Sequence, residues 1–227
     1  MRTLLLLAAL ATGLPASTAL AHTEPAQAHH PRAGGGPGAG TPAAAGSPVQ
    51  AAATTGTRDP RAYFTDADLT DQDGRKLRFY SDVLQGKTVV LSVGYTSCTE
   101  ACPLITRQLV QVRQELGDTF GKQVFFVTLT SDPARDTPKA LKAFARKQGA
   151  DVAGWSFLTG RTEDVHRILK RLGAFSQDVD DHSTALYVMD VDARRMRRLL
   201  PNLPPKAIAE AARLIATSGK AAAAGAH

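Results

Sequence analysis

Two short, almost continuous apolar runs constrain the fold of this chain more than any other feature of its sequence. The runs are Thr88–Gly94 and Val124–Thr130, and uninterrupted apolar strands of this length are typical of sheets that are buried on both faces. After the first run, apolar residues recur at helical spacing from Ile105 to Leu116, and Gly117 ends the pattern. This alternation of strand and helix predicts an α/β domain.

Weaker signals on both sides of these runs extend the α/β pattern. Asp73-Gly74 is typical of a tight turn and predicts an N-terminal β-hairpin between residues 68–72 and 76–79. The other expected elements are a helix from Asp136-Thr137-Pro138, a short strand at Phe157-Leu158, a helix from Thr162, a strand Ala185–Met189, its hairpin partner Met196–Leu200, and a helix from Pro205. The late hairpin adds antiparallel strands, so we expect a central mixed β-sheet flanked by helices.

The two ends of the chain differ in composition from its middle. Arg2, an apolar stretch and Ala19-Leu20-Ala21 match the pattern of an export signal. Residues 1–21 are therefore expected to be a signal peptide, with an uncleaved membrane anchor as the alternative. Residues 22–59 are rich in Ala, Gly and Pro and are expected to be a disordered linker, because they cannot bury enough apolar surface to fold. The folded domain is expected at residues 60–218 and a disordered tail at 219–227, in a protein exported to the periplasm.

The composition excludes several classes of protein. The chain has 227 residues but only two cysteines, which excludes a disulfide-dense mini-protein and any multi-cysteine zinc or iron–sulfur module. Its net charge of +6 is too small and too widely spread to indicate nucleic-acid binding. No apolar run reaches the ~20 residues of a transmembrane helix.

The two cysteines stand where the first apolar strand meets its helix, in the segment Cys98-Thr-Glu-Ala-Cys102-Pro103. Free backbone N–H groups at a helix start stabilise thiolates, and a spacing of four residues puts both sulfur atoms on one face of a turn. In an exported protein such a pair forms a disulfide or binds a metal. His182 is a candidate third ligand, because it comes just before a strand and loops at one end of adjacent strands converge. Two thiolates and an imidazole suit Cu(I), and the same set could also take Cu(II) or zinc.

Four segments of the chain form a recognisable series. They are Gly94–Pro103 with its Cys-x-x-x-Cys-Pro motif, Ser131–Pro138, Trp155–Gly160, and Asp181-His182-Ser183 with Tyr187–Asp190. Taken together and in this order, they resemble the SCO/SenC family of copper-binding proteins, which serve the assembly of cytochrome c oxidase. The segments span most of the expected domain, so the resemblance implies a thioredoxin-like fold.

The resemblance also implies a function and a set of site residues. The family's copper ligands correspond to Cys98, Cys102 and His182, and its acidic residue beside the site corresponds to Asp132. For Asp132 we expect an electrostatic role rather than ligation. The implied function is a copper metallochaperone that binds one copper ion, as Cu(I) or Cu(II), and delivers it to the copper site of cytochrome c oxidase. The implied partners are the oxidase subunit that carries this site and other periplasmic copper chaperones.

Two enzymatic functions also use a dithiol at this position. A thiol–disulfide oxidoreductase would reduce the copper-site cysteines of the oxidase, with Cys98 as the nucleophile. Thioredoxin-like reductases carry a proline that faces the dithiol, however, and no proline lies between Gln177 and Asp190. A peroxiredoxin-like peroxidase is disfavoured, because Thr96 lies two residues before Cys98 rather than three. Metal delivery and disulfide reduction both stay open.

The sequence departs from the family pattern after its last core strand. The segment Asp190-Val-Asp-Ala-Arg194 lacks the glycine that the family's turn carries here, which leaves the geometry of the hairpin open. Arg194, Arg195, Arg197 and Arg198 then form a basic cluster. The cluster indicates a solvated edge that discourages strand addition, or else a surface for an acidic partner or an anionic membrane.

Overall fold

The computed structural model describes residues 59–224. The predicted signal peptide (1–21) and nearly all of the predicted linker (22–59) lie outside the described residues, as do the last three residues of the chain. Within the described part, no helix is both long and apolar enough to cross a bilayer.

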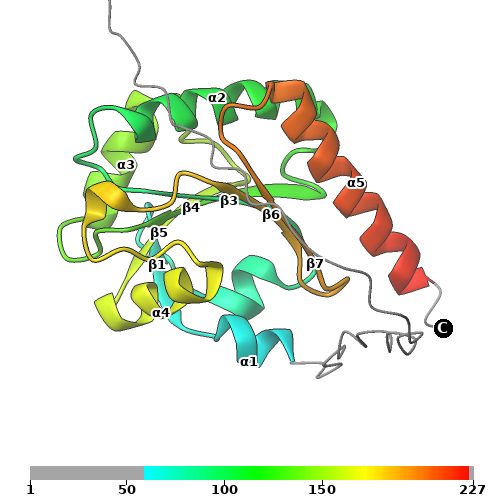
Figure 1. Cartoon of the computed structure of the whole chain (residues 1–227), viewed down its shortest axis with the longest axis horizontal. Helices are drawn as coiled ribbons and strands as arrows, with labels where there is room; N and C mark the ends of the chain where they lie inside the picture. The colour runs from blue at the N-terminus through cyan, green and yellow to red at the C-terminus, as the bar shows by residue number, and fades with distance from the viewer. Residues whose placement is uncertain (1–58, 225–227) are drawn as a thin grey trace, which may run out of the picture. The chain divides into compact units, whose positions relative to one another are not determined.

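A seven-stranded mixed sheet forms the centre of the domain, with the strand order β2-β1-β5-β4-β3-β6-β7 (Figure 1). The strands are β1 (Asp68–Asp71), β2 (Lys76–Arg78), β3 (Thr88–Gly94), β4 (Val124–Thr130), β5 (Trp155–Gly160), β6 (Leu186–Asp190) and β7 (Arg195–Leu199). Strands β3, β4 and β5 are parallel, whereas β1 pairs antiparallel with β5 and β6 pairs antiparallel with β3. The three parallel strands are therefore flanked on one side by the hairpin β1–β2 and on the other by the hairpin β6–β7.

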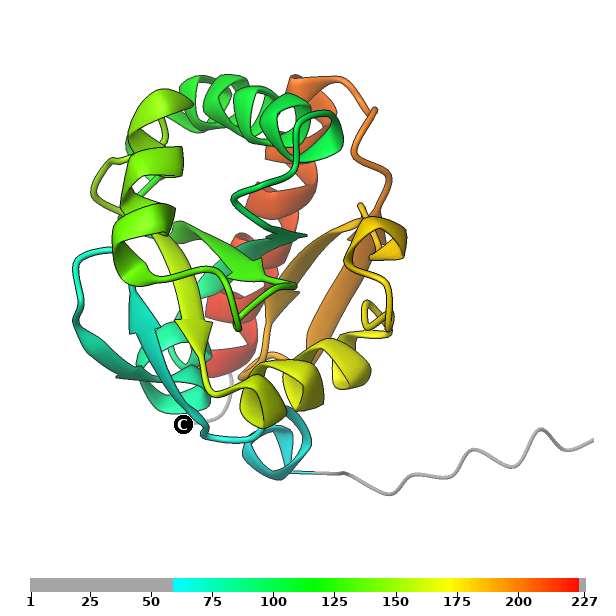
Figure 2. The same cartoon turned by 90° about the vertical axis from the view of Figure 1, so that its left-hand side faces the viewer.

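Helices cover both faces of this sheet (Figures 1 and 2). One face packs against α2 (Ala101–Leu116), α3 (Pro138–Lys147) and α5 (Pro205–Ala224). The opposite face packs against α1 (Pro60–Phe64), the π-helix η1 (Phe79–Leu84) and α4 (Thr162–Leu172). Two 3-10 turns complete the domain, η2 (Gly117–Thr119) and η3 (Val179–Asp181).

The alternation of side chains along each strand separates two hydrophobic cores. In β3, Val89 and Leu91 belong to the core beneath α4, whereas Val90 belongs to the core beneath α2 and α5. In β6, Tyr187 and Val188 divide between the same two cores. All seven residues of β3 are buried, because the strand is covered on both faces and paired on both edges. The continuous apolar run that predicts this strand has this physical origin.

The predicted mixed sheet with flanking helices and an N-terminal hairpin is confirmed. In the β1–β2 turn, Gly74 adopts φ +80°, and the carboxylate of Asp71 accepts hydrogen bonds from the backbone N–H groups of Asp73 and Arg75. Strand β5 is longer than the expected Phe157-Leu158. It pairs with strands on both sides, and the Gln72 amide also bonds its backbone at Trp155 and Phe157.

Other differences concern two unpredicted elements and the ends of two predicted ones. The sequence pattern predicts neither the π-helix η1 nor the short helix α1. Helix α5 continues to Ala224, past the domain boundary expected at residue 218. In the β6–β7 turn, where the usual glycine is missing, Arg194 itself adopts φ +53°.

Candidate metal centre

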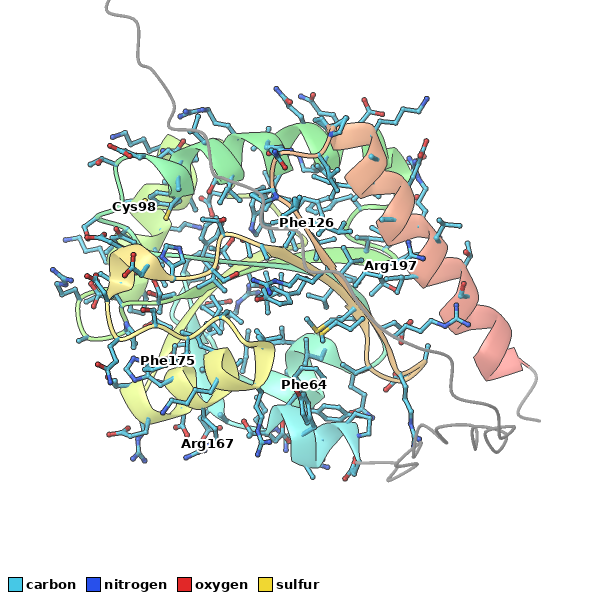
Figure 3. All side chains as sticks on the ribbon, viewed as in Figure 1. Phe64, Cys98, Phe126, Arg167, Phe175 and Arg197 are labelled. Atoms are coloured by element: carbon cyan, nitrogen blue, oxygen red, sulfur yellow. The ribbon has the colours of Figure 1, made fainter. Side chains whose placement is uncertain are left out.

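The topology of the sheet brings the cysteines and His182 to the same end of the domain. Strand β3 ends at Gly94, just before the loop that carries Cys98. Because β6 runs antiparallel to β3 and pairs Tyr187 with Leu91, the residues before β6 lie beside the residues after β3. Figure 3 labels Cys98 at this end of the sheet, near the gold segment that precedes β6.

The two cysteines lie on one turn at the start of α2. Cys98 is half-buried in the loop, whereas Cys102 is buried in the first turn of the helix, and both are free thiols. The backbone N–H of Cys102 donates to Cys98 Sγ over 3.2 Å. Cys102 packs tightly on the end of β3, because a Cβ added to Gly94 would lie 3.3 Å from its sulfur atom. The sulfur atom of Cys98 thus lies against the first turn of α2, in which Cys102 stands.

The surroundings of the two thiols shift their pKa values in opposite directions. Burial would raise the pKa of Cys98, but hydrogen bonds from the Cys102 side chain, from the backbone at Cys102 and Glu100, and from Tyr95 together lower it below its ordinary value. Burial, followed by the hydrogen bond with Cys98, raises the pKa of Cys102 to about 12. Cys98 is therefore the more readily ionised thiol of the pair.

His182 follows η3 and is buried, whereas Thr184, two residues later, is exposed. Its Nδ1 atom lies 2.5 Å from the carbonyl oxygen of Val179, and its Nε2 atom is buried without a hydrogen-bond partner among the described residues. A buried polar atom without a partner costs free energy unless a ligand satisfies it. An Nδ1–H donated to a carbonyl leaves Nε2 with a lone pair, which is the arrangement of a metal-binding histidine.

A pocket of about 360 Å³ connects these groups. Cys98 and His182 both line it, together with Tyr95, Asp180 and Thr184. The structure thus brings two of the three predicted ligands to one pocket and holds Cys102 against Cys98. As the side chains stand, no three His, Cys, Asp or Glu residues within 59–224 are close enough to share one metal ion.

Tyr95 and Asp180 are contacts of the site that the sequence reasoning missed. The Tyr95 hydroxyl donates to the carboxylate of Asp180 in the η3 segment, and Tyr95 also contributes to the lowered pKa of Cys98. The Tyr95 ring lies edge-on to the imidazole of His182, with 5.5 Å between the ring centroids. Tyr95 therefore links the cysteine loop to the histidine loop. The only sequence signal was its place in the motif Gly94–Pro103.

Asp136 is a second missed residue. Its buried carboxylate accepts hydrogen bonds from the backbone N–H of Thr96 at 3.2 Å and from the hydroxyls of Thr96 and Thr130 at 2.5 Å each. Sequence reasoning places Asp136 in the start of α3, but Thr137 is the residue that caps this helix. Asp136 instead ties the cysteine loop to the end of β4.

Asp132 is buried, but its hydrogen bonds are to Thr130, Arg135 and Asp136 and do not reach the thiols or His182. Its carboxylate pairs with Arg135 Nε at 2.5 Å, and its carbonyl oxygen accepts from the backbone N–H groups of Arg135 and Asp136. Asp132 thus builds the turn after β4, and its expected electrostatic role stays a prediction. His166 lies on α4 against Phe175, with 4.8 Å between ring centroids, apart from the pocket.

Comparison with known proteins relates most of the chain to one family. The model of the SCO1/SenC family matches residues 55–217. The SCO2-like protein of Rickettsia felis is 27% identical over 155 residues, which cover 64% of this chain and 73% of that protein. A Stutzerimonas stutzeri protein whose name refers to copper binding is 33% identical over 106 residues. That match covers 47% of this chain and spans only 50% of the relative's length.

Solved structures share the architecture. A SCO1/SenC family lipoprotein from Bacillus anthracis is 26% identical, with a TM-score of 0.59 over 67% of this chain and 94% of that one. Copper-bound ScoI of Bradyrhizobium japonicum is 24% identical, with a TM-score of 0.55 over 65% of this chain and 96% of that one. These similarities confirm the predicted thioredoxin-like fold.

Proposed function

Since the chain belongs to the SCO1/SenC family, we propose that it binds one copper ion through Cys98, Cys102 and His182 and delivers it to the copper site of cytochrome c oxidase. Proteins of this family bind copper and take part in the assembly of that oxidase. The specific ligands, the delivery step and the periplasmic location are our proposal for this chain.

The buried Nε2 atom of His182 is the observation that carries the proposal. It has no hydrogen-bond partner among the described residues, and its ring lines the same pocket as Cys98. A metal ion in this pocket would satisfy it. The donor set fits copper, because soft thiolates favour Cu(I) and imidazole also suits copper. Tyr95 already links the loop of the cysteines to the loop of His182.

The proposed binding requires reduced cysteines. Copper would bind the thiolates of Cys98 and Cys102, and the ionisation of Cys102 would release the proton that its high pKa retains in the absence of metal. Oxidation of the pair to a disulfide would remove both thiolates and so abolish binding. The export signal expected at residues 1–21 supports a periplasmic location, where copper and oxidised thiols are both encountered.

Delivery can be tested with defined components. The reduced protein is loaded with one equivalent of Cu(I), separated from free metal, and mixed with the metal-free, reduced copper-site domain of an oxidase subunit. We expect copper to move to that domain, and to move only from a chain that carries both cysteines. Retention of copper by this protein, under conditions in which the recipient binds free Cu(I), would contradict the delivery role.

The opposed pKa shifts of the thiols favour a second candidate, disulfide reduction. The Cys98 thiolate would attack the recipient's disulfide and form a mixed disulfide, and one recipient thiolate would leave. Cys102, after losing its proton, would attack the Cys98 sulfur and release the second recipient thiolate. The recipient is then reduced and the pair Cys98–Cys102 is oxidised. A reductase needs both cysteines but not His182, so reduction of an oxidised oxidase domain by His182→Ala separates the two functions.

A further inference from the structure

We propose that the outer edge of β7, with three arginines on the strand and a fourth in the turn before it, is the docking surface for an acidic, extended segment of the copper recipient. The inference rests on the proposed function only in taking the partner to be the recipient. We call this surface the basic edge and define it as Arg194, Arg195, Arg197 and Arg198 with the backbone of β7. Figure 3 labels Arg197 on this strand.

The basic edge is a free edge of the sheet. Strand β7 is last in the strand order and pairs only with β6 among the described strands. The outward-facing backbone N–H and C=O groups of an edge strand are a template for another extended segment. Five residues of β7 offer a ladder about 13 Å long, at roughly 3.3 Å per residue.

The arginines of the basic edge are exposed and are not neutralised by the domain itself. None of the four forms an ion pair with a residue in the range 59–224. By contrast, the exposed Arg75, Arg146 and Arg167 each have an acidic partner. The basic edge is thus a concentration of uncompensated positive charge, and the matching partner is acidic.

The basic edge leads directly to the proposed copper site. Arg198 donates to the Ser183 hydroxyl over 3.0 Å, and Ser183 follows His182. A second pocket is lined by His182, Thr184, Arg198 and the exposed Leu200. It shares His182 and Thr184 with the pocket that Cys98 lines. A segment that follows β7 toward its end at Leu199 therefore arrives beside His182.

The arrangement of the charges favours a protein strand over a membrane or a second copy of this chain. Along β7, side chains alternate between faces, so Arg195 and Arg197 lie on one face and Arg198 on the other. Charges on both faces straddle a bound strand, whereas a flat anionic membrane would contact one face. A second copy would bring like charges together at the edge, which is unfavourable.

The test uses the purified, reduced protein and a synthetic ten-residue peptide of alternating Thr and Glu. A peptide of the same length with Gln in place of Glu is the control. Binding is measured by fluorescence anisotropy, and the contact surface by NMR amide shifts. The variant Arg195→Gln/Arg197→Gln is compared with Lys139→Gln/Lys147→Gln, which removes the same charge from exposed positions on α3. Cu(I) titration of both variants is run in parallel.

We expect the Glu peptide to bind and to shift amide signals of β7, and the Gln peptide to bind at least about fivefold more weakly. The β7 variant should lose about fivefold in affinity for the Glu peptide, whereas the α3 variant should not. Equal binding of both peptides, shifts elsewhere in the domain, or an unaffected β7 variant would overturn the proposal. So would arginine-dependent binding to phosphatidylglycerol vesicles without peptide binding, or dimerisation through the edge. Copper binding is measured separately, so failure of the wild-type protein to bind Cu(I) would count against the proposed function and not against the docking surface.

Discussion

The two thiols of the site lie four residues apart, yet their environments differ. Cys98 receives hydrogen bonds from Tyr95 and from the first turn of α2, which favours its thiolate. Cys102 lies against Gly94 at the end of β3, where burial favours the neutral thiol. The start of α2 therefore presents one thiol that ionises readily, Cys98 in the loop, and one that stays protonated, Cys102 in the first turn.

This difference predicts the pH dependence of alkylation. Hydrogen bonds from the Cys102 side chain and from the backbone at Cys102 and Glu100 lower the pKa of Cys98, and Tyr95 adds to this effect. Reaction of Cys98 with iodoacetamide should therefore have its midpoint below the ~8.5 of a free cysteine. Cys102, with a pKa of about 12, should stay unmodified below about pH 9. In Tyr95→Phe the Cys98 midpoint should rise, because one of the contacts that lower its pKa is lost. Mass spectrometry of peptides that contain each cysteine gives both profiles.

Tyr63→Phe is the matched control, because the Tyr63 hydroxyl bonds to the carbonyl oxygen of Arg171 in α4, far along the chain from the cysteines. The same Cys98 midpoint in the wild-type protein and in Tyr95→Phe would show that Tyr95 does not stabilise the thiolate.

The contacts of Asp136 predict that replacing one of its carboxylate oxygens with an amide group lowers the stability of the domain. In Asp136→Asn the side chain loses the negative charge and one of its two acceptor oxygens. At least one of the donors on Thr96 and Thr130 then lacks a hydrogen-bond acceptor in a buried environment. We expect the free energy of unfolding to fall by about 1–3 kcal/mol. Denaturant unfolding measures the change, and Asp118→Asn at an exposed position should stay within about 0.5 kcal/mol of the wild type. Equal stabilities of the two variants would refute the anchoring role of Asp136.

At the scale of the elements, the β6–β7 turn contains backbone strain at Arg194, and the hairpin forms in spite of it. Arg194 adopts φ +53°, a conformation that a residue with a Cβ adopts at a cost of about 1–2 kcal/mol. The carboxylate of Asp190 accepts from the backbone N–H of Ala193, and Arg194 donates to the carbonyl oxygen of Val191, so the turn is held by its own bonds. The missing glycine strains this turn without abolishing the hairpin.

Arg194→Gly should therefore stabilise the domain. Glycine adopts this conformation without the Cβ penalty, although it also makes the unfolded chain more flexible. We expect a net gain of about 1 kcal/mol and a rise in Tm of about 2–4 °C, measured by thermal unfolding. Ala193→Gly, at a neighbouring position without a positive φ, should give a loss or no change. A lower Tm for Arg194→Gly would contradict the assignment of strain to this residue.

The elements that sequence analysis predicts well are those whose burial leaves a periodic pattern. β3, β4, α2 and α4 are examples, since their apolar residues face the two cores. The length of β5 could not be predicted, because it depends on pairing with β1 and on the Gln72 amide. Likewise η1 packs Phe79 and Leu84 into a core through a π-helical turn that leaves no recognisable spacing.

The residues of the site divide in the same way. Cys98, Cys102 and His182 are predicted as ligands from the sequence, because the chemistry of cysteine and histidine and the resemblance to a family point to them. Tyr95 contacts Asp180, 85 positions further along the chain, and Asp136 contacts Thr96, 40 positions earlier. No local sequence pattern encodes contacts at such separations.

At the scale of the whole molecule, the fold assembles the site from three distant parts of the chain. The end of β3 supplies the dithiol, the turn after β4 anchors its loop, and the segment before β6 supplies the imidazole. The antiparallel placement of β6 beside β3 brings the last of these to the first. We propose that this end of the sheet is a three-ligand copper site.

The most direct test of this claim is a Cu(I) titration of the reduced protein against a competing chelator. His182→Ala is compared with the wild type, and His166→Ala on α4 is the control. We predict one tight equivalent in the wild type and in His166→Ala, and binding weakened by roughly tenfold or more in His182→Ala, because a ligand is lost. Equally tight binding by His182→Ala would contradict the role of His182 as a ligand. Failure of the wild type to compete with the chelator would contradict the proposed copper site as a whole.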